Sequence, residues 1–186
     1  MIFIEKLDSK FMSQFLTLTL NMGVPKGWNN FSKVGEVIEG TKFIAFKVPL
    51  SGNATWNLST LKRNVPDLTD IIDLTDTEKY YRAADCEALG WTHTKIRATG
   101  GGQVPSQTVV ESFYSAVAGA QEDGLIGVHC THGLNRTGYL ICRYLIEKED
   151  WDPETAIDAF NQARGHQLER ENYLAHLRAR GWEPHA

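Results

Sequence analysis

The sequence predicts an α/β fold in which helices flank a mainly parallel central sheet. Three features lead to this prediction: apolar strand segments alternate with helical ones, the last apolar strand runs into a glycine-containing loop, and only helical patterns follow that loop. Strands joined through helices pair in parallel, because the crossover returns the chain to the same end of the sheet. The length of 186 residues suits a single domain around one core.

Four segments carry strand patterns. Residues 41–50 (TKFIAFKVPL) alternate in part between apolar and polar side chains, residues 71–74 (IIDL) form a short apolar run, and residues 92–96 give a weaker signal. Residues 125–128 (LIGV) are apolar without interruption, as expected of a strand buried on both faces. We therefore expect the segment after Val128 to lie at the carboxyl end of a central strand, where α/β sheets bind ligands.

The helical segments show their starts and their buried faces. Residues 105–106 open a helix whose apolar side chains recur at the helical period, namely Val109, Val110, Phe113, Ala116 and Val117. Residues 139–148 form the next helical pattern. Asp152 is expected to cap a third helix, with Pro153 at its first position, and a fourth helix covers about residues 169–180.

The composition limits how an anionic ligand can be held. The net charge is −4, so the molecule as a whole does not attract nucleic acid, and an anionic substrate needs a local group of positive side chains. The three cysteines, Cys86, Cys130 and Cys142, are an odd number without CxxC spacing. This argues against a disulfide framework or a zinc site and favours a reducing compartment. No apolar run reaches the roughly 18 residues of a membrane span, so no membrane partner is expected.

Residues 128–138 (VHCTHGLNRTG) carry the most informative pattern. They read as a strand, a tight loop and the start of a helix, with Cys130 and Arg136 six residues apart. Backbone N–H groups of such a loop can converge on one concavity, as they do in anion sites at helix N-termini. The helix dipole and the Arg136 cation are expected to lower the pKa of the Cys130 thiol, which gives a thiolate nucleophile at neutral pH.

This arrangement is the H-C-x5-R-[ST] signature of cysteine phosphatases. Cys130 is predicted to attack phosphorus and form a thiophosphate intermediate, while Arg136 binds two equatorial oxygens of the phosphoryl group. Water then hydrolyses the intermediate, Thr137 is predicted to hydrogen-bond the departing sulfur, and His129 is expected to support the loop from behind. The residues predicted to bind the phosphoryl group are Thr131, His132, Gly133, Leu134, Asn135, Arg136 and Thr137.

Two other interpretations of Cys130 stay open. Cys130 could be a buried structural thiol, but Arg136 would then be unexplained. Cys130 could bind a metal together with His129 and His132, but no second ligand group stands at metal spacing elsewhere. We expect neither a metal nor a cofactor, because Arg136 and the backbone amides neutralise the phosphoryl charge, so hydrolysis should survive EDTA.

The wider sequence resembles the RNA 5′-triphosphatase branch of the cysteine phosphatases, whose fold is protein tyrosine phosphatase-like. This branch includes the triphosphatase domains of animal mRNA capping enzymes, a baculovirus phosphatase and the RNA/ribonucleoprotein-complex-interacting phosphatases, the last of which the sequence resembles most. The resemblance covers about residues 27–177. The segments that carry it are residues 40–50, 71–81, 125–146 and 160–173.

The resemblance implies a substrate and further site residues. The expected activity is removal of a 5′ phosphate from triphosphate RNA, with removal of a second phosphate left open. The expected partners are RNA 5′ ends and ribonucleoprotein complexes, and the chain is expected to act as a monomer in the nucleus, with the cytoplasm left open. Arg170 is implied as a second arginine that grips the terminal or bridging phosphates. Lys79, Arg82 and Lys47 are weaker candidates, since each could be a solvated surface charge.

A general acid is hard to find in the sequence. Many cysteine phosphatases carry an Asp on a mobile loop about 30 residues before the nucleophile, but residues 95–107 contain neither Asp nor Glu. A diphosphate leaving group is a weak base and departs with little protonation, so we expect good activity on anhydrides and poor activity on phosphotyrosine. Asp73, at the end of a strand, is the remaining candidate catalytic acid, and a turn or cap role is the alternative.

The domain boundaries follow from these assignments. Residues 1–22 are expected to be a variable or flexible extension, residues 23–180 the phosphatase domain, and residues 181–186 a short tail. The apolar run at 11–20 resembles a signal peptide only in part, because acidic residues stand where positive charge is expected and no small-residue cleavage site follows.

Three other functions remain as alternatives. A dual-specificity protein phosphatase would use the same loop. An inositol-lipid phosphatase tends to carry lysines within the loop, where this chain has Thr131 and Leu134. A catalytically minor RNA- or protein-binding module would not need the intact pair of Cys130 and Arg136, which argues against it.

Overall fold

A five-stranded sheet with strand order β1-β2-β5-β3-β4 forms the centre of the protein. The computed structural model describes residues 23–180, so the predicted extension at 1–22 and the tail at 181–186 lie outside the described residues. Strands β2, β5, β3 and β4 pair in parallel, and β1 pairs with β2 in antiparallel. The predicted mainly parallel sheet is confirmed, with one antiparallel edge strand added. The strand bounds are β1 Val34–Val37, β2 Phe43–Lys47, β3 Leu68–Asp73, β4 Thr92–Lys95 and β5 Leu125–Cys130.

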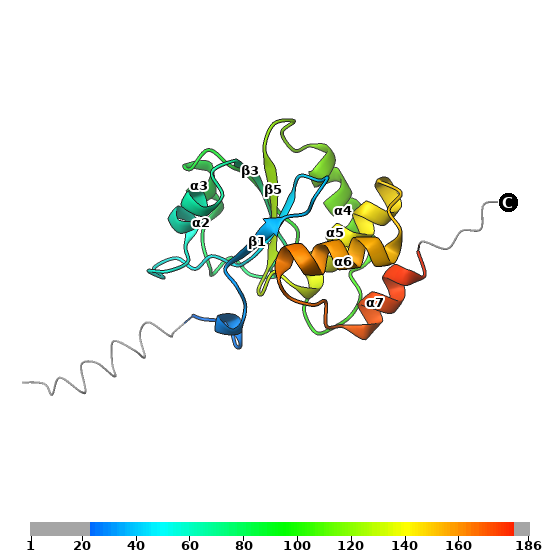
Figure 1. Ribbon diagram of the computed structural model, residues 1–186. Helices are drawn as coiled ribbons and strands as arrows, with labels where there is room; N and C mark the ends of the chain where they lie inside the picture. The colour runs from blue at the N-terminus through cyan, green and yellow to red at the C-terminus, as the bar shows by residue number, and fades with distance from the viewer. Residues whose placement is uncertain (1–22, 181–186) are drawn as a thin grey trace, which may run out of the picture.

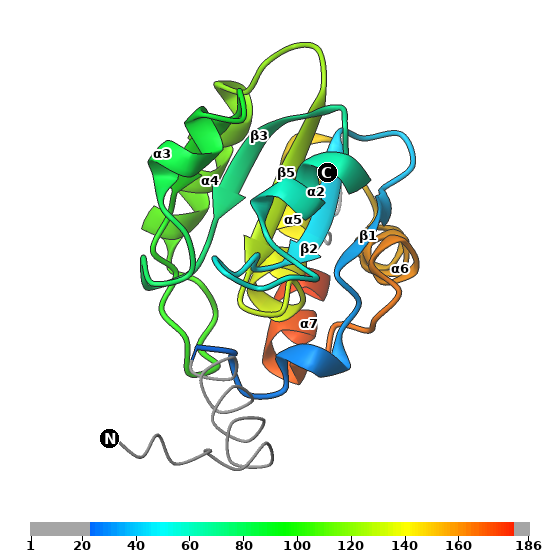
Figure 2. The same cartoon turned by 90° about the vertical axis from the view of Figure 1, so that its left-hand side faces the viewer.

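Helices cover both faces of the sheet, which gives three layers. Figure 1 shows α2 and α3 on one side of the strands and α4, α5, α6 and α7 on the other, and Figure 2 shows the same arrangement from the side. On the first face lie α2 (Leu58–Asn64) and α3 (Ala83–Glu87). The second face is covered by α4 Gln107–Ala118, α5 Asn135–Lys148, α6 Pro153–Arg164 and α7 Glu171–Arg178.

The side chains of the inner strands alternate between two cores. In β2, Phe43 and Ala45 pack with the larger helical layer, whereas Ile44 and Phe46 pack with α2 and α3. Because every one of these four residues is buried, the strand reads as continuously apolar, as the sequence pattern of a parallel strand predicts. Cys142 lies fully buried in the larger core.

The helix starts agree with the sequence pattern where capping residues are present. Ser106 accepts a hydrogen bond from the backbone N–H of Val109 at the start of α4. Asp152 does the same for Thr155 at the start of α6, with Pro153 at the first helical position. Among residues 23–180, no helix combines the length and the apolar character that a membrane crossing requires.

Four elements were not expected from the sequence: β1, α2, α3 and the short 3-10 helix η1 at Trp28–Asn30. Helix α2 carries a readable signal, because Asn57 and Thr60 form a reciprocal capping box. The others are three to five residues long, which is too short for a period of two or 3.6 residues to be distinguished.

The carboxyl ends of the parallel strands meet at one end of the sheet, and the arrowheads of β3 and β5 point to it in Figure 2. There the backbone N–H of Leu74 donates to the carbonyl of His129 at 2.8 Å, and that of Val48 donates to the carbonyl of Thr131 at 3.2 Å. These bonds continue the pairing of neighbouring strands by one residue past the ends of β3 and β2. They fix the start of the loop that follows β5.

We expect Asp152→Ala to lower the free energy of unfolding by about 1 kcal/mol, because the first turn of α6 loses its capping acceptor. Urea denaturation measures this loss. Asp158→Ala is the matched control, since it removes an exposed carboxylate from the same helix without touching the cap. Equal losses in the two variants would contradict the assigned capping role.

Candidate active site

The segment between β5 and α5 forms a tight loop around the sulfur of Cys130. Cys130 is the last residue of β5, and α5 begins at Asn135. Gly133 has φ +64, and a Cβ at this position would overlap the carbonyl of Phe46. Only glycine meets both conditions, so this residue lets the loop turn closely over the end of β2.

The carbonyl groups of the loop are held away from its centre. The His129 ring donates through Nδ1 to the Cys130 carbonyl at 3.1 Å, and Arg164 donates to the carbonyls of His132 and Gly133 at 2.9 and 2.8 Å. With the Thr131 carbonyl bonded to Val48, four successive carbonyls face outward. The intervening N–H groups are thereby left to face an anion, as in other backbone anion sites.

A pocket of about 180 Å³ opens over this loop. Of the residues predicted to bind phosphate, those that line it are Thr131, His132, Asn135, Arg136 and Arg170. The other three, Gly133, Leu134 and Thr137, are buried behind the pocket. Sequence reasoning missed the remaining lining residues, Gly100, Gly101, Gly102 and Tyr173. The glycine run was visible as a flexible connection, but nothing local connects it to a loop 30 residues away.

Arg136 is fixed by three hydrogen bonds. Its Nη1 donates to the carbonyls of Leu74 and Ala98 at 3.0 and 2.7 Å, and its Nη2 donates to Thr131 Oγ1 at 3.2 Å. The guanidinium is therefore held at the pocket by the backbone just after β3 and after β4, and by the Thr131 side chain. This arrangement places a preorganised cation where phosphoryl oxygens would lie.

The structure favours the ionised form of Cys130. Burial acts to raise the pKa of its thiol, but the charge of Arg136, the Thr137 hydroxyl and the N–H groups of Leu134 and Thr137 outweigh burial and lower the pKa. The Thr137 hydroxyl is buried and completes no hydrogen bond to nitrogen or oxygen among the described residues, so it is free to serve the sulfur. Cys86 and Cys142 behave in the opposite way, because burial raises the pKa of each thiol.

A second arginine reaches the same pocket. Arg170 precedes α7, is exposed, and holds its guanidinium 5.7 Å from the centre of the Tyr173 ring. A Cβ at Gly102 would overlap that guanidinium, and Gly102 has φ +95, so the glycine gives Arg170 access to the pocket. The two arginines thus approach the cavity from α5 and from the start of α7.

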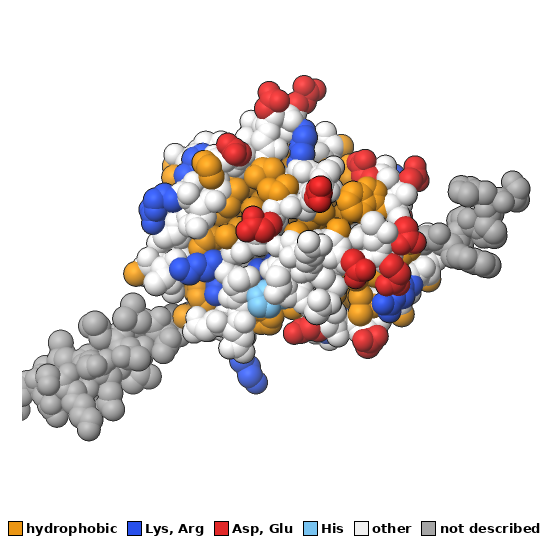
Figure 3. All heavy atoms as spheres, viewed as in Figure 1, with side chains coloured by type: hydrophobic (Ala, Val, Ile, Leu, Met, Phe, Trp, Pro, Cys, Tyr) orange, Lys and Arg blue, Asp and Glu red, His pale blue; other side chains and the backbone are white. Residues whose placement is uncertain are grey.

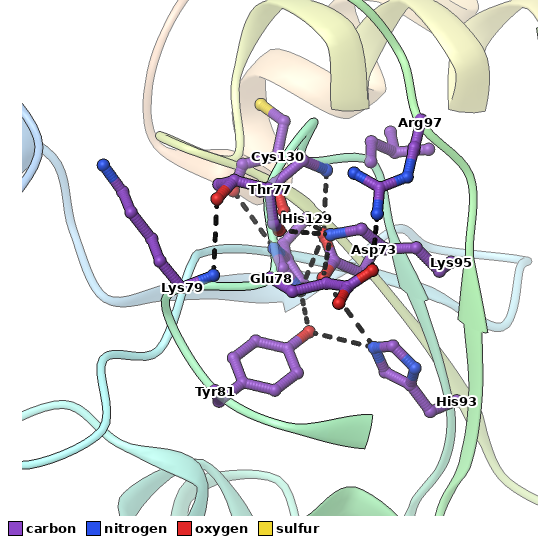
Figure 4. A network of polar contacts seen from close by, with 12 residues as sticks. Asp73, Thr77, Glu78, Lys79, Tyr81, His93, Lys95, Arg97, His129 and Cys130 are labelled. Carbon is purple, nitrogen blue, oxygen red and sulfur yellow. Dashed lines mark hydrogen bonds and ion pairs between the residues drawn. The ribbon is translucent and has the colours of Figure 1, made fainter.

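Asp73 lies in a buried polar network beneath the loop, and Figure 4 shows the sulfur of Cys130 pointing away from this network. The carboxylate accepts a hydrogen bond from Lys95 Nζ at 2.9 Å and from the backbone N–H of Thr75 at 2.8 Å. Lys95 also donates to Thr75 Oγ1 and to the carbonyl of Thr77, both at 2.7 Å. The network therefore joins the ends of β3 and β4 to the segment that follows β3.

The geometry argues against a general-acid role for Asp73. Burial acts to raise the pKa of its carboxyl, but hydrogen bonds from His93, Lys95 and the Thr75 N–H hold that pKa well below its usual range. A carboxylate that stays ionised has no proton to donate, and Asp73 does not line the pocket. Its position matches the turn role that the sequence left open.

His129 connects this network to the loop. Its Nδ1 donates to the Cys130 carbonyl, so its Nε2 accepts from the Tyr81 hydroxyl. Burial lowers the pKa of His129, which keeps the ring neutral. The ring therefore supports the loop from behind, as expected from the sequence.

The weaker phosphate-binding candidates lie elsewhere. Arg82 pairs with Asp85 at the start of α3, and the exposed Lys79 lies over the Tyr80 ring with its amine 5.2 Å from the ring centre. Lys47 is only 4 % exposed and lies behind the loop. None of the three lines the pocket, and their assignment as ligands for the triphosphate is not supported by the structure.

A larger cavity of about 500 Å³ lies at the opposite, amino end of β2 and β5, and it contains none of the predicted site residues. Within residues 23–180, no group of three or more His, Cys, Asp and Glu side chains is arranged to hold a metal ion.

Figure 3 shows acidic side chains spread over one face, with basic side chains in small groups between them.

The catalytic domain of dual-specificity phosphatases matches residues 65–181 of this chain. The chain is also 43% identical to the rat (Rattus norvegicus) RNA/RNP complex-1-interacting phosphatase, over 84% of its own length and 53% of the relative's. The human (Homo sapiens) protein of that name is likewise 43% identical, over 83% of this chain and 51% of the relative. The chain thus spans about half the length of these curated relatives.

A viral relative is matched over nearly its whole length. The tyrosine-protein phosphatase of Autographa californica nuclear polyhedrosis virus is 38% identical, over 82% of this chain and 98% of the viral protein. Among solved structures, PTPMT1 in complex with PI(5)P has a TM-score of 0.64 at 20% identity, covering 81% of this chain and 95% of that one. This structural similarity supports the fold alone.

We expect Asp73→Asn to lower the free energy of unfolding at pH 7 by about 3 kcal/mol, because Lys95 loses its charged partner. The pKa of Asp73 is lower in the folded chain than the value of about 3.9 in an unfolded one, so its stabilisation is present above that value and is lost as the pH falls. The deficit of the variant should therefore shrink below about pH 4 in urea titrations.

The same variant tests the catalytic role. With an aryl phosphate substrate, Asp73→Asn should keep the alkaline limb of the wild-type pH–rate profile. Loss of that limb would identify Asp73 as the general acid. Glu78→Gln, which removes an exposed carboxylate paired with Arg97, is the control for both measurements.

Proposed function

This chain belongs to the dual-specificity phosphatase family, and within that family we propose that it removes phosphate from the 5′-triphosphate end of RNA. The observation that carries the proposal is the composition of the pocket wall. Among the described residues, no Asp or Glu lines the pocket, whereas Arg136 and Arg170 both do. Such a pocket is suited to a substrate with several phosphates whose leaving group needs no carboxylic acid.

The leaving group decides which substrate this pocket can serve. Removal of phosphate from phosphotyrosine or phosphoserine expels a phenoxide or an alkoxide. Such a leaving group requires a proton in the transition state. The terminal phosphate of a triphosphate leaves behind a diphosphate, a much weaker base that departs with little protonation. Since Asp73 is buried, ionised and outside the pocket, residues 23–180 supply no carboxylic acid that an ester substrate would use.

The second arginine fits the additional charge of such a substrate. With the terminal phosphate over the Cys130 loop, the next phosphates extend toward the pocket mouth, where Arg170 is exposed. A guanidinium at this position can donate to oxygens that remain on the leaving group and stabilise the charge that develops there. A phosphoprotein substrate carries no phosphate at that position.

The reaction then proceeds in two balanced steps. The Cys130 thiolate attacks the terminal phosphorus, an S–P bond forms, and the P–O bond to the next phosphate breaks with its electron pair on the bridging oxygen. Diphosphate RNA departs. Water next attacks phosphorus, the S–P bond breaks, and the proton released by water leaves with inorganic phosphate or solvent. Thr137 stabilises the returning thiolate through its buried hydroxyl.

The names of the relatives are consistent with more than one substrate. The rat and human relatives are named for interaction with an RNA/RNP complex, which supports RNA as a substrate or partner. The viral relative is named a tyrosine-protein phosphatase, which favours a dual-specificity protein phosphatase as the second candidate. Values of kcat/KM measured side by side on triphosphate RNA and on phosphotyrosine peptides separate the two functions. Comparable kcat/KM on both substrates would contradict the proposed RNA triphosphatase function.

We expect the chain to release phosphate from γ-labelled triphosphate RNA in the presence of EDTA, and Cys130→Ser to slow this at least about 1000-fold, because the nucleophile is lost. β-labelled RNA shows whether a second phosphate is removed. Cys142→Ser makes the same chemical change in the core and should keep the activity while folded. Activity that survives in Cys130→Ser would contradict the proposed mechanism.

Arg170→Ala should reduce kcat/KM on triphosphate RNA about 10- to 100-fold, the loss expected for charge-assisted hydrogen bonds. It should change hydrolysis of p-nitrophenyl phosphate far less, because that substrate has one phosphate. Arg178→Ala removes another exposed arginine from α7 and is the matched control. Equal losses on the two substrates would show that Arg170 does not recognise the additional phosphates.

A further inference from the structure

Two cations lie buried directly behind the phosphate-binding loop. Lys47 is 4 % exposed and Arg164 is 1 % exposed, and neither lines the pocket. Lys47 is the last residue of β2 and lies opposite Cys130 in the parallel register of β2 and β5. Arg164 is the last residue of α6. The ends of β2 and α6, which are distant in sequence, therefore each place a positively charged side chain behind the same loop.

Arg164 binds the loop through its carbonyl groups. Its Nε donates to the Gly133 carbonyl at 2.8 Å, and its Nη2 donates to the carbonyls of His132 and Ser32, both at 2.9 Å. Its Nη1 donates to Ser32 Oγ. All of these acceptors are neutral, so the hydrogen bonds satisfy the donors of the guanidinium without neutralising its charge.

Lys47 is held in the same way. Its Nζ donates to the carbonyls of Trp28 and Phe31 at 3.0 and 2.9 Å, and it lies 3.7 Å from the centre of the Trp28 ring. The carbonyls and the aromatic ring stabilise a cation, but neither carries a full negative charge. The ammonium therefore also remains uncompensated.

No carboxylate oxygen of the described residues lies within 4.0 Å of either cation. Arg143 shows the usual arrangement for comparison: its guanidinium is 2 % exposed and pairs with Glu147 at 2.8 Å. A buried charge without an opposite charge is costly, and natural proteins retain it where function uses the resulting field.

The anion that faces this field is the catalytic sulfur. Burial lowers the pKa of Arg164 to about 10, and the charge of Cys130 acts in the opposite direction and favours the cation. Burial, Arg164 and Lys33 together lower the pKa of Lys47 to about 8, so its amine is still mainly charged at neutral pH. The two cations therefore repel each other and are both attracted by negative charge in the loop.

We propose that Lys47 and Arg164 form a cationic base beneath the phosphate-binding loop, for which the Cys130 thiolate or a bound phosphoryl group is the counter-anion. They are positioning residues, since they touch loop carbonyls rather than substrate. The base stabilises the ionised sulfur from behind while Arg136 does so from the pocket. The inference concerns the cysteine nucleophile itself and holds for any phosphate substrate of this site.

Other titratable and charged groups also lie near the sulfur, besides Lys47 and Arg164. On the side of β3 and β4 lies the Asp73–Lys95 pair with the neutral His129 and the nearby His93. On the side of β1 and α6, Lys33 is exposed, and burial lowers the pKa of His166, which keeps its ring neutral. Arg136, Asp73 and Lys95 remain in every variant of the test below, so a shift in the Cys130 pKa does not come from their loss.

The test is the pH dependence of Cys130 alkylation by iodoacetamide in the full chain. Cys86 and Cys142 are buried thiols with raised pKa values, so the fast reaction reports Cys130. Arg164→Met and Lys47→Met should each raise the Cys130 pKa by about one unit, which lowers the alkylation rate at acidic pH about 10-fold. The acid limb of kcat/KM should move in parallel. Arg164→Lys should restore part of the shift.

Arg143→Met is the matched control, because it removes a buried arginine whose charge is already paired. The proposal is overturned if folded Arg164→Met or Lys47→Met titrates like wild type, or if Arg143→Met shifts the titration equally. Circular dichroism and thermal unfolding establish which variants are folded. If Arg164→Met does not fold, Lys47→Met and Arg164→Lys decide alone: an unshifted Lys47→Met contradicts the base, and a shifted one supports it.

Discussion

The structure depends on keeping the sulfur of Cys130 negatively charged although it is almost completely buried. Cys130 is only 4 % exposed, so burial alone would keep its thiol protonated. The N–H groups of the loop and the Arg136 cation reverse that preference. They do so only while the loop keeps its carbonyls outward, since a single carbonyl turned inward would place a negative dipole against the sulfur.

The strands on either side of β5 each help to hold one part of that loop. On the side of β3 and β4, the Tyr81 hydroxyl binds His129 next to the Asp73–Lys95 pair, and His129 binds the Cys130 carbonyl. On the side of β1 and β2, Arg164 binds the next carbonyls, and Val48 binds that of Thr131. One network is charge-balanced and the other is positive. The loop geometry therefore depends on both, whereas the electrostatic preference for an anion comes from one side.

The sequence predicts what is local and leaves open what the fold assembles. Cys130 and Arg136 belong to one strand-loop-helix segment, so their relationship is readable at a spacing of six residues. Asp73 shows the limit: its place at a strand end was correct, but only the structure reveals that Lys95, 22 residues away, keeps its carboxyl ionised. Arg170 came from a family resemblance. Lys47 and Arg164 looked like ordinary basic residues because burial and the absence of a carboxylate partner depend on tertiary contacts.

The distribution of charge also bears on which part of a substrate is recognised. The chain has a net charge of −4, and the face in Figure 3 carries scattered acidic side chains and only small groups of basic ones on a largely uncharged surface. A long polyanion gains little from such a surface, because binding to its repeated phosphates requires a matching row of cations. The cations that matter here converge on one small pocket instead. The proposed triphosphate substrate matches this arrangement, because its successive phosphates would meet both Arg136 and Arg170 in a single cavity.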